Sequence, residues 1–248
     1  MNGNSKNDIQ AIIIAGGFGT RLNSLFPKTP KSLVPLNKIP FIYYLLEKLI
    51  DYGIKEVIIC TGFLRDSYKK ELGTKYKSLQ INYSEENEPL GTAGALKNIP
   101  IEKIKNLNLV LNGDCFCDFN FDLMLQDYQN QNNGIMILIK SIENDGNFGQ
   151  ILINSSNKVL NFLEKTNNKE VILANLGYYL IDKASFKMLP EKFPSSLEYD
   201  FFPKMIHKNF YAFKTSEEFL EIGTPESLMS SELKLKQTFD FKKFELKK

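Results

Sequence analysis

Short apolar runs alternate with helix-like segments through the first half of the chain. Residues 9–15 are almost continuously apolar, which is typical of a strand buried on both faces of a parallel sheet. Residues 40–52 instead carry apolar side chains at helical spacing, beginning at Pro40 and followed by Gly53. Such alternation predicts a mostly parallel α/β sheet that binds its ligand at the carboxyl ends of the strands. We predict strands over residues 9–15, 56–60, 79–83 and 107–111, and helices over residues 40–52, 65–72 and 91–97.

The second half is richer in strand-like segments, with few long helices between them. We therefore expect antiparallel strands that add to the first sheet, together with a helix over residues 197–207. Helical spacing resumes after Pro225, and residues 231–248 carry many lysines. We expect one domain over residues 1–230 and a basic C-terminal tail, which is a solvated helix or a frayed end. The predicted strands of this half are residues 134–140, 149–153, 159–164, 172–181 and 210–213.

Composition narrows the classes of function. The chain has 248 residues, 43% of them hydrophobic, with 31 Lys plus Arg against 29 Asp plus Glu. A net charge of +2 gives no electrostatic case for nucleic acid or an anionic membrane as the main partner. The N-terminus lacks the apolar core of a signal peptide, and no apolar stretch approaches the ~20 residues of a membrane span. We expect a soluble, cytoplasmic protein, with Cys60, Cys115 and Cys117 as reduced, buried thiols.

The most informative segment follows the first predicted strand and reads Ala-Gly-Gly-Phe-Gly-Thr-Arg-Leu, residues 15–22. Gly16, Gly17 and Gly19 allow a tight turn that brings backbone N–H groups against phosphate oxygens. Arg21 adds a planar fork of donors suited to phosphate. The segment is neither a Walker A motif nor a complete dinucleotide-binding fingerprint, which argues against a dinucleotide-dependent oxidoreductase. Taken alone, it indicates only phosphate binding.

A second motif follows, with Lys31 ten residues after Arg21. It contains Pro-Lys-Ser-Leu-Val-Pro, residues 30–35. With both motifs present, the chain resembles the sugar nucleotidyltransferase family, also called nucleoside-diphosphate-sugar pyrophosphorylases, and the resemblance covers nearly its whole length. It implies a Rossmann-like α/β fold with an antiparallel sugar-binding part. The nucleotide-binding half would span about residues 9–115, and the sugar-binding half about residues 116–230.

The resemblance also implies roles for these residues. Arg21 would help to neutralise the triphosphate, and Lys31 would contact the reacting phosphates. In this reaction a sugar phosphate oxygen attacks the α-phosphorus of a nucleoside triphosphate and pyrophosphate leaves. Because two anions must approach each other, cations are needed to cancel their repulsion and to stabilise the developing charge. The residues implied to hold the triphosphate are Ala15, Gly16, Gly17, Gly19 and Thr20.

A second family block, residues 88–96, resembles the wall around the nucleobase. Gly91 and Thr92 belong to it, and the glycines of the block would permit close approach. Glu88 offers acceptor oxygens that could pair with N1–H and N2–H of guanine. The alternative for Glu88 is an acid in a solvent-exposed loop.

Two carboxylates match the family's metal site. Asp114 follows the predicted strand at residues 107–111, where a carboxylate would hold Mg²⁺ against the phosphates and also serve catalysis. The family usually has an aspartate where this chain has Glu221, before Ile-Gly-Thr-Pro-Glu. The extra methylene of Glu221 moves its oxygens outward, and Mg²⁺ tolerates distorted geometry poorly. The resemblance implies Asp114 and Glu221 as the metal ligands, and the change leaves open an altered metal preference or a reduced activity.

The sugar phosphate contacts implied by the resemblance lie between these carboxylates. Gly149 belongs to a segment that shapes the sugar pocket in relatives. Glu164 and Lys165 match a pair that contacts sugar hydroxyls and phosphate, and Asn175 belongs to the family's Asn-x-Gly block. The alternative for Glu164 and Lys165 is a cross-strand surface ion pair.

Residues 196–203, Ser-Leu-Glu-Tyr-Asp-Phe-Phe-Pro, and the short chain resemble compact guanylyltransferases that activate D-glycero-D-manno-heptose 1-phosphate. Guanylyl transfer to mannose 1-phosphate remains an alternative, as does uridylyl or thymidylyl transfer to another sugar 1-phosphate. A non-catalytic regulator that binds sugar nucleotides is a further alternative, raised by Glu221. An apolar patch around the C-terminal helix would permit a homodimer.

Overall fold

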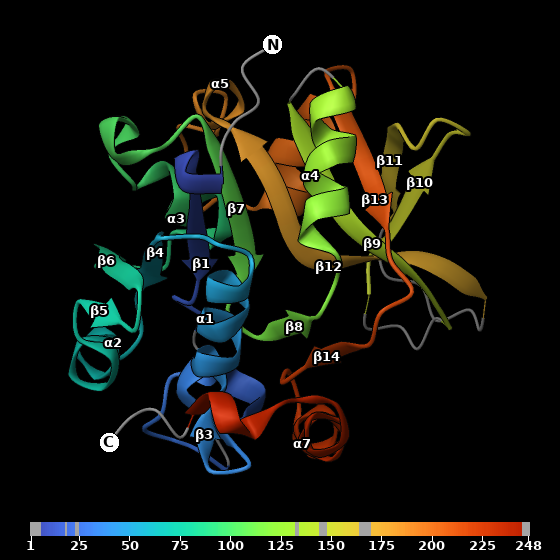
Figure 1. Cartoon of the computed structure of the whole chain (residues 1–248). Coiled ribbons are helices and arrows are strands. Elements are labelled where there is room, and N and C mark those ends of the chain that lie inside the picture. Colours follow the sequence, from blue (N-terminus) through green and yellow to red (C-terminus); the bar gives the residue numbers. More distant parts are fainter. Residues whose placement is uncertain are drawn as a thin grey trace.

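Parallel strands form the centre of the main sheet in this computed structural model, which describes residues 6–17, 19–22, 25–131, 134–143, 148–163 and 170–244 (Figure 1). Strand β1 lies between β4 and β7, and β6 follows β4, with every one of these pairs parallel. The prediction of a mostly parallel central sheet is therefore confirmed. The strands are β1 (Ile9–Ile14), β4 (Glu56–Thr61), β6 (Leu79–Glu85) and β7 (Leu107–Asn112).

Both faces of this parallel region are buried, as the continuous apolar run of β1 requires. Ile13 belongs to the hydrophobic cluster that includes helix α1 (Phe41–Asp51), whereas Ile12 belongs to the cluster that includes helix α3 (Gly91–Lys97). Helix α1 begins after Pro40, and the chain leaves it through Gly53, whose φ of +80° suits glycine. The helices predicted over residues 65–72 and 91–97 are α2 (Arg65–Leu72) and α3.

Antiparallel strands extend the sheet beyond β7. Strand β12 (Val171–Asp182) pairs antiparallel with β7 and with β9 (Ile135–Glu143). This arrangement confirms the predicted antiparallel additions. The remaining strands of this part are β10 (Gln150–Ile153) and β11 (Val159–Leu163) at the edge, and β13 (Phe210–Lys214), which pairs parallel with β9.

Several short elements complete the fold. The helix expected over residues 197–207 is a π-helix, Leu197–Phe201, followed by α6 (Phe202–Met205). Helix α4 (Phe121–Asn130), which packs on the same face of the sheet as α1, was not predicted. The other short elements are β2 (Pro35–Leu36), β3 (Ile39–Pro40), β5 (Lys75–Tyr76), α5 (Lys183–Phe186) and 3₁₀ turns at Lys6–Asp8, Thr20–Leu22, Lys31–Leu33, Ile101–Lys103 and Phe241–Phe244.

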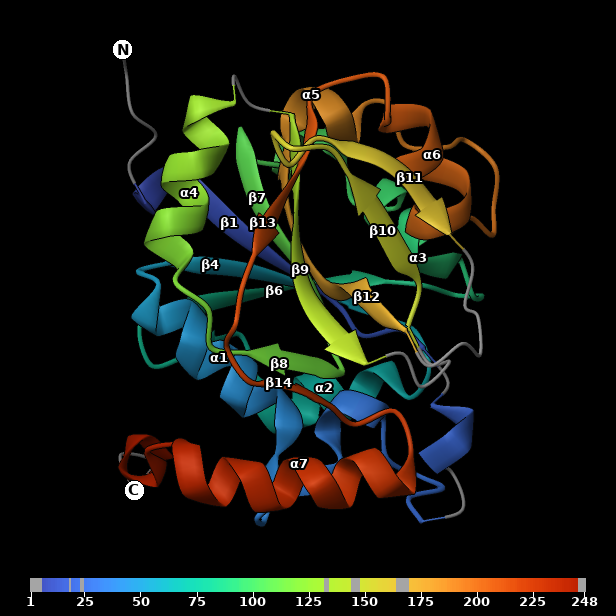
Figure 2. The ribbon, with the colours of Figure 1, turned by 90° about the vertical axis from the view of Figure 1, so that its right-hand side faces the viewer.

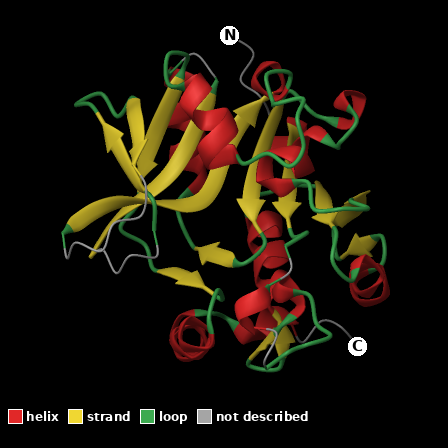
Figure 3. Ribbon diagram, turned by 180° about the vertical axis from the view of Figure 1, so that it is seen from behind, coloured by secondary structure: helices red, strands yellow, loops and turns green. Residues whose placement is uncertain are grey.

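A small strand pair lies beyond the carboxyl ends of the central strands, which point toward it in the view from behind (Figure 3). Strand β8 (Cys115–Cys117) pairs antiparallel with β14 (Phe219–Glu221), and helix α7 (Pro225–Thr238) runs beneath both in Figure 2. The hydroxyl of Ser231 on α7 donates to the carbonyl oxygen of Glu221 at 2.8 Å. Helix α7 therefore supports the strand that ends at Glu221.

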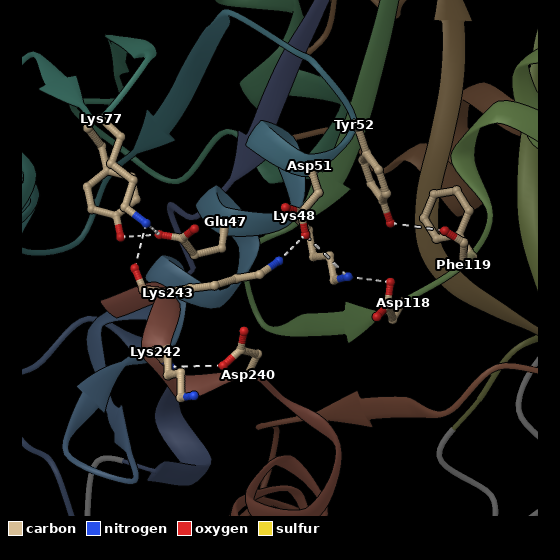
Figure 4. Close-up of polar contacts among 11 residues, drawn as sticks. Glu47, Lys48, Asp51, Tyr52, Lys77, Asp118, Phe119, Asp240, Lys242 and Lys243 are labelled. Atoms are coloured by element: carbon tan, nitrogen blue, oxygen red, sulfur yellow. Dashed lines mark hydrogen bonds and ion pairs between the residues drawn. The ribbon is translucent and has the colours of Figure 1, made fainter. Parts of the chain in front are cut away.

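The C-terminal segment differs from the solvated or frayed tail that the lysines suggested. Helix α7 continues across residue 230, and its Leu235 is fully buried. Beyond it, the rings of Phe239 and Phe244 lie 4.9 and 5.2 Å from the ring of Tyr44. Lys243 also contacts Asp51 of α1 at 2.5 Å (Figure 4). The aromatic rings and Lys243 therefore hold this segment against α1, as far as Phe244.

None of the helices in the described part of the chain combines the length and apolar composition needed to cross a membrane.

Candidate active site

One cavity lies where the strand order reverses, between the carboxyl ends of β1 and β7. We call this space, of about 280 Å³, cavity A. Strands β4 and β6 lie to one side of β1 and β7 lies to the other, so the loops after β1 and β7 diverge and leave a crevice. The end of β1 and the loop after it contribute Ile14, Ala15, Gly16 and Gly17, and the end of β7 and the loop after it contribute Asn112, Gly113 and Asp114.

Three of the five residues expected to hold the triphosphate line cavity A. Ala15, Gly16 and Gly17 line cavity A, and a Cβ at Gly16 would lie 2.9 Å from a carboxylate oxygen of Glu86. A larger residue at position 16 would therefore displace the Glu86 carboxylate. Gly19 and Thr20 line neither cavity A nor the second cavity described below. Phe18 lies outside the described residues.

The carboxylate that faces cavity A is Glu86 rather than Glu88. Glu86 is 8% exposed and lines the cavity, and its Oε2 accepts the backbone N–H of Leu90 at 3.2 Å. Burial raises the pKa of the Glu86 carboxyl above its ordinary value, although the Leu90 N–H opposes this shift. Glu88 is exposed and lines neither cavity. Sequence reasoning missed Glu86, yet it directly follows β6, where the rule of strand carboxyl ends could have found it.

Gly91 and Thr92 line cavity A at the first turn of α3, as expected. The floor of the cavity holds an ion pair, in which Lys31 Nζ lies 2.5 Å from Asp114 Oδ2. Lys31 is the first residue of a 3₁₀ turn. The Tyr68 hydroxyl links this turn to β1, because it lies 2.7 Å from the Ser32 hydroxyl and donates to the carbonyl oxygen of Ala15. Burial favours a higher pKa for the Asp114 carboxyl, but the Lys31 ammonium outweighs it and holds that pKa below the usual range.

A second cavity, cavity B, of about 520 Å³, lies beside β12. Asn112 and Asp114 line both cavities, so the two spaces meet at the end of β7. Arg21, expected to help neutralise the triphosphate, lines cavity B and not cavity A. The other predicted site residues that line cavity B are Gly149, Asn175 and Glu221.

Asn175 is held in place by its own surroundings. Its side-chain oxygen accepts the N–H of Gly177 at 2.9 Å, and its amide nitrogen donates to the hydroxyl of Tyr179 at 2.8 Å. The strand bulges here, because the register with β9 shifts between Asn175 and Tyr179. Gly177 has a φ of +75°, and a Cβ there would lie 2.6 Å from the side-chain nitrogen of Asn112. The bulge thus brings the Asn-x-Gly block against the end of β7. Glu164 and Lys165 lie outside the described residues.

Strand pairing brings the two predicted metal ligands to one place. Glu221 lies opposite Cys115, the residue after Asp114, and the N–H of Ile222 donates to the carbonyl oxygen of Asp114 at 3.0 Å. Both carboxylates line cavity B. In the described part of the chain, no group of three His, Cys, Asp or Glu residues could hold an ion by itself. Two hard oxygen donors beside an open cavity fit Mg²⁺, which keeps waters and binds substrate phosphates in such sites.

The cysteines are buried free thiols, as predicted. Burial raises the pKa of the Cys117 thiol to about 12, and burial together with the Asp114 carboxylate raises that of Cys115. Both thiols therefore stay protonated at neutral pH.

Comparison with known proteins gives the family. The family model for nucleotidyl transferases matches residues 10–238. The D-glycero-alpha-D-manno-heptose 1-phosphate guanylyltransferase of Campylobacter jejuni is 33% identical over 225 residues, covering 88% of this chain and 96% of that protein. The mannose-1-phosphate guanylyltransferase catalytic subunit beta of Drosophila melanogaster is 31% identical, covering 90% of this chain and 62% of that protein.

Solved structures agree with this assignment. The crystal structure of HddC from Yersinia pseudotuberculosis has a TM-score of 0.79 and 29% sequence identity, covering 91% of this chain and 99% of that one. The same protein complexed with GMP-PN has a TM-score of 0.78. Nucleotidyltransferases of this family generally use a divalent metal, and a nucleoside triphosphate and a sugar 1-phosphate are the substrates that fit the family. The chain belongs to the nucleotidyl transferase family.

Proposed function

We propose that this chain transfers the guanylyl group of GTP to D-glycero-D-manno-heptose 1-phosphate, forming the GDP-sugar and releasing pyrophosphate. The observation that carries the proposal is the meeting of cavities A and B at Asp114. Two ligands that occupy adjoining cavities can bring their phosphates together at one point, which is what a two-substrate transfer needs. The likeness to heptose and mannose 1-phosphate guanylyltransferases supports the choice of base and sugar.

In this reaction a bond forms between an oxygen of the sugar phosphate and the α-phosphorus of GTP. The bond from the α-phosphorus to the oxygen that bridges to the β-phosphate breaks, and pyrophosphate leaves with that electron pair. The N–H groups of Gly16 and Gly17 would hold the triphosphate, with Lys31 beside it, while Arg21 would neutralise the sugar phosphate from cavity B. Lys31 and Arg21, one beside each anion, would reduce the repulsion between the two anions and stabilise the charge that develops between them.

Mg²⁺ is the metal we propose, held by Asp114 and Glu221. When bound, it supplies positive charge to the phosphates and orients them. Asp114 lies where both ligands would meet it, so its carboxylate is the better supported of the two.

Glu86 is the group we propose to read the base. Its Oε2 is engaged by the Leu90 N–H, and the carboxylate lies against Gly16 at the wall of cavity A. An ionised carboxylate offers acceptors only, and guanine presents two adjacent donors, N1–H and N2–H, whereas uracil and thymine present N3–H alone. A buried acceptor left without a partner costs affinity, so this arrangement favours guanine.

On the sugar side, Asn175 and Gly149 are proposed to contact the sugar phosphate in cavity B, and Glu164 and Lys165 stay predictions. Mannose 1-phosphate is the second candidate substrate, supported by the relative from Drosophila melanogaster. A non-catalytic sugar-nucleotide-binding regulator is less well supported, because Lys31 and Asp114 form their ion pair and Arg21 faces the same junction. A homodimer and a cytoplasmic location stay predictions.

A matrix of substrates tests the proposal. GTP, CTP, UTP and dTTP would each be combined with heptose, mannose, glucose and glucosamine 1-phosphates in the presence of Mg²⁺, and pyrophosphate release would be measured. We expect the fastest release with GTP and D-glycero-D-manno-heptose 1-phosphate. Faster release with mannose 1-phosphate would make mannose 1-phosphate the sugar substrate. Faster release with UTP or dTTP would make uracil or thymine the base of the nucleotide substrate. Binding without release in any combination would favour the regulator.

A further inference from the structure

The segment at residues 195–201, which we call the bridge segment, is joined to the start of α3 by backbone hydrogen bonds. Ser195 N–H donates to the carbonyl oxygen of Leu90 at 2.8 Å. The Ser195 carbonyl accepts the N–H groups of Ala93 and Gly94 at 2.9 and 3.2 Å. The first N–H groups of a helix have no partner within it, and α3 has no side-chain cap. The bridge segment therefore supplies the N-terminal cap of α3 from about a hundred residues further along the chain.

The glycines of the Gly-Thr-Ala-Gly block make room for this contact. Gly91 has a φ of +76°, and a Cβ there would lie 2.4 Å from the carbonyl oxygen of Ser195. A Cβ at Gly94 would lie 3.0 Å from the ring of Phe193. The sequence pattern suggested that these glycines admit a nucleobase. In the structure, the group that approaches Gly91 most closely is the Ser195 backbone, while Gly94 lies close to Leu90 and Phe193.

Thr92 completes the junction through its side chain. Its Oγ1 accepts the backbone N–H of Leu197 at 2.8 Å, and the residue also lines cavity A. A threonine hydroxyl has one donor hydrogen and two acceptor sites. Because Leu197 uses an acceptor site, the hydrogen of the hydroxyl is left to donate toward a ligand in cavity A.

The far side of the bridge segment faces cavity B. Glu198 and Tyr199 line that cavity. Glu198 is oriented by Ser196, whose hydroxyl donates to its Oε2 at 3.0 Å and accepts its backbone N–H. Residues 197–201 form a π-helix, a conformation that is rare and often found at functional sites. One continuous segment therefore touches the wall of cavity A at Leu197 and the wall of cavity B at Glu198.

We propose that Thr92 is a positioning residue that couples the two cavities through the bridge segment. This inference rests on the proposed function, since it assigns the nucleoside triphosphate to cavity A and the sugar 1-phosphate to cavity B. A nucleotide that accepts the Thr92 hydroxyl hydrogen fixes that side chain, which fixes the Leu197 amide and with it the carboxylate of Glu198. Each ligand then strengthens the binding of the other by the same factor.

The first test measures binding. The dissociation constant of D-glycero-D-manno-heptose 1-phosphate would be measured by calorimetry with and without a saturating non-hydrolysable GTP analogue, for wild type and Thr92→Val. We expect the analogue to tighten sugar phosphate binding to the wild type by a factor on the order of 5 to 150, the usual range of such coupling. Thr92→Val, which keeps the shape and removes the hydroxyl, should reduce this factor to near one, and Thr92→Ser should restore it.

The second test does not depend on turnover. Hydrogen exchange of the Leu197 amide would be followed with and without the same analogue. The analogue should slow exchange in wild type and Thr92→Ser, and have little effect in Thr92→Val. Thr238→Val is the matched control, because that hydroxyl donates to Lys234 within α7 and lies outside both cavities.

Two results would overturn the inference. One is equal coupling in wild type and Thr92→Val. The other is Leu197 exchange that the analogue leaves unchanged in the wild type. Absence of pyrophosphate release would instead contradict the proposed function, and the exchange measurement would still decide the role of Thr92.

Discussion

Lys31 and Asp114 lie 83 residues apart in the chain and 2.5 Å apart in space. Each holds the other at the junction of the cavities, and Lys31 is only 17% exposed. A ligand phosphate that enters cavity A can take the place of the carboxylate as partner of the ammonium, so the cation needs little rearrangement. The pair is therefore preorganised for charge stabilisation.

Replacing either member should remove most activity and leave the fold intact. Lys31→Ala removes the cation, and Asp114→Asn removes the negative charge at nearly constant shape. We expect each to lower kcat by about 10²- to 10³-fold, as for the loss of one preorganised stabilising group. Steady-state kinetics would measure the loss, with circular dichroism as the control for folding. A variant with a near-normal rate would show that its residue has no catalytic role.

Glu86 gives a pH-dependent signature in folding stability. Burial raises the folded-state pKa of its carboxyl, so the ionised form is disfavoured in the folded protein relative to the unfolded chain. Its contribution is fully present below the unfolded-state pKa, about 4.3, and is lost as pH rises through the folded-state pKa. Glu86→Gln should therefore have a higher Tm than wild type at pH 8, and the difference should shrink as pH falls to 4.

Thermal unfolding of both proteins across this pH range would measure the effect. Glu88→Gln is the matched control, because Glu88 is exposed and lines neither cavity. A difference between Glu86→Gln and wild type that does not change with pH would mean that desolvation of the carboxylate is not its cause.

Glu221 can be tested through metal dependence. If it is a ligand, Glu221→Ala should raise the Mg²⁺ concentration for half-maximal activity by at least about tenfold, since even residues that only orient metal ligands are worth 10- to 100-fold. Glu221→Asp should have a smaller effect, because the shorter side chain keeps the carboxylate and only draws it back toward β14. Magnesium titrations of activity would measure both. Identical Mg²⁺ dependence in all three proteins would remove Glu221 from the metal site.

Single residues also mark the limit of sequence reasoning. Gly16, Lys31 and Asp114 were identified from motifs because phosphate chemistry needs those residue types at those places. The motif pointed to Glu88, whereas Glu86, the first residue after β6, is the carboxylate that lines cavity A. Which carboxylate turns inward depends on the contact between Glu86 and Gly16, which comes from another part of the chain.

Among the elements, those with a strong local signal were predicted within a few residues. Helix α1 lies between Pro40 and Gly53, and both residues are readable in the sequence. Helix α4 had a readable signal too, since Asn120 caps it and apolar residues follow at helical spacing at positions 121, 124, 125 and 128. Strands β8 and β14 had none, because each has three residues and its partner lies about a hundred residues away.

Helix α7 should contribute directly to stability. Leu235 is fully buried, so Leu235→Ala should lower the free energy of unfolding by about 2–5 kcal/mol through lost burial and the cavity it leaves. Leu233 lies on the same helix and is 62% exposed, and Leu233→Ala should change stability by no more than about 0.5 kcal/mol. Urea unfolding would compare the two. Equal effects would mean that the helix does not pack as described.

At the scale of the whole molecule, the alternation of apolar runs and helical segments in the first half predicted the parallel sheet. The glycine motif after β1 predicted that phosphates bind at the carboxyl end of this strand. What the sequence pattern could not supply is the way the two halves meet. Asn175 and Glu221 reach the end of β7 through a bulge in β12 and a short strand pair, and both depend on tertiary contacts. The basic tail was misjudged for the same reason, since its phenylalanines pack against Tyr44 of α1 and Phe116 of β8, which lie far away in the sequence.

The central claim is that the chain moves a nucleoside monophosphate from cavity A to a sugar phosphate in cavity B. The most direct measurement follows the α-phosphate of labelled GTP, with D-glycero-D-manno-heptose 1-phosphate and Mg²⁺ present. We predict that the label appears in GDP-heptose, in step with pyrophosphate, and only when the sugar phosphate is added. Label that stays in GTP, or that leaves as GMP or GDP whether or not a sugar 1-phosphate is present, would contradict the account.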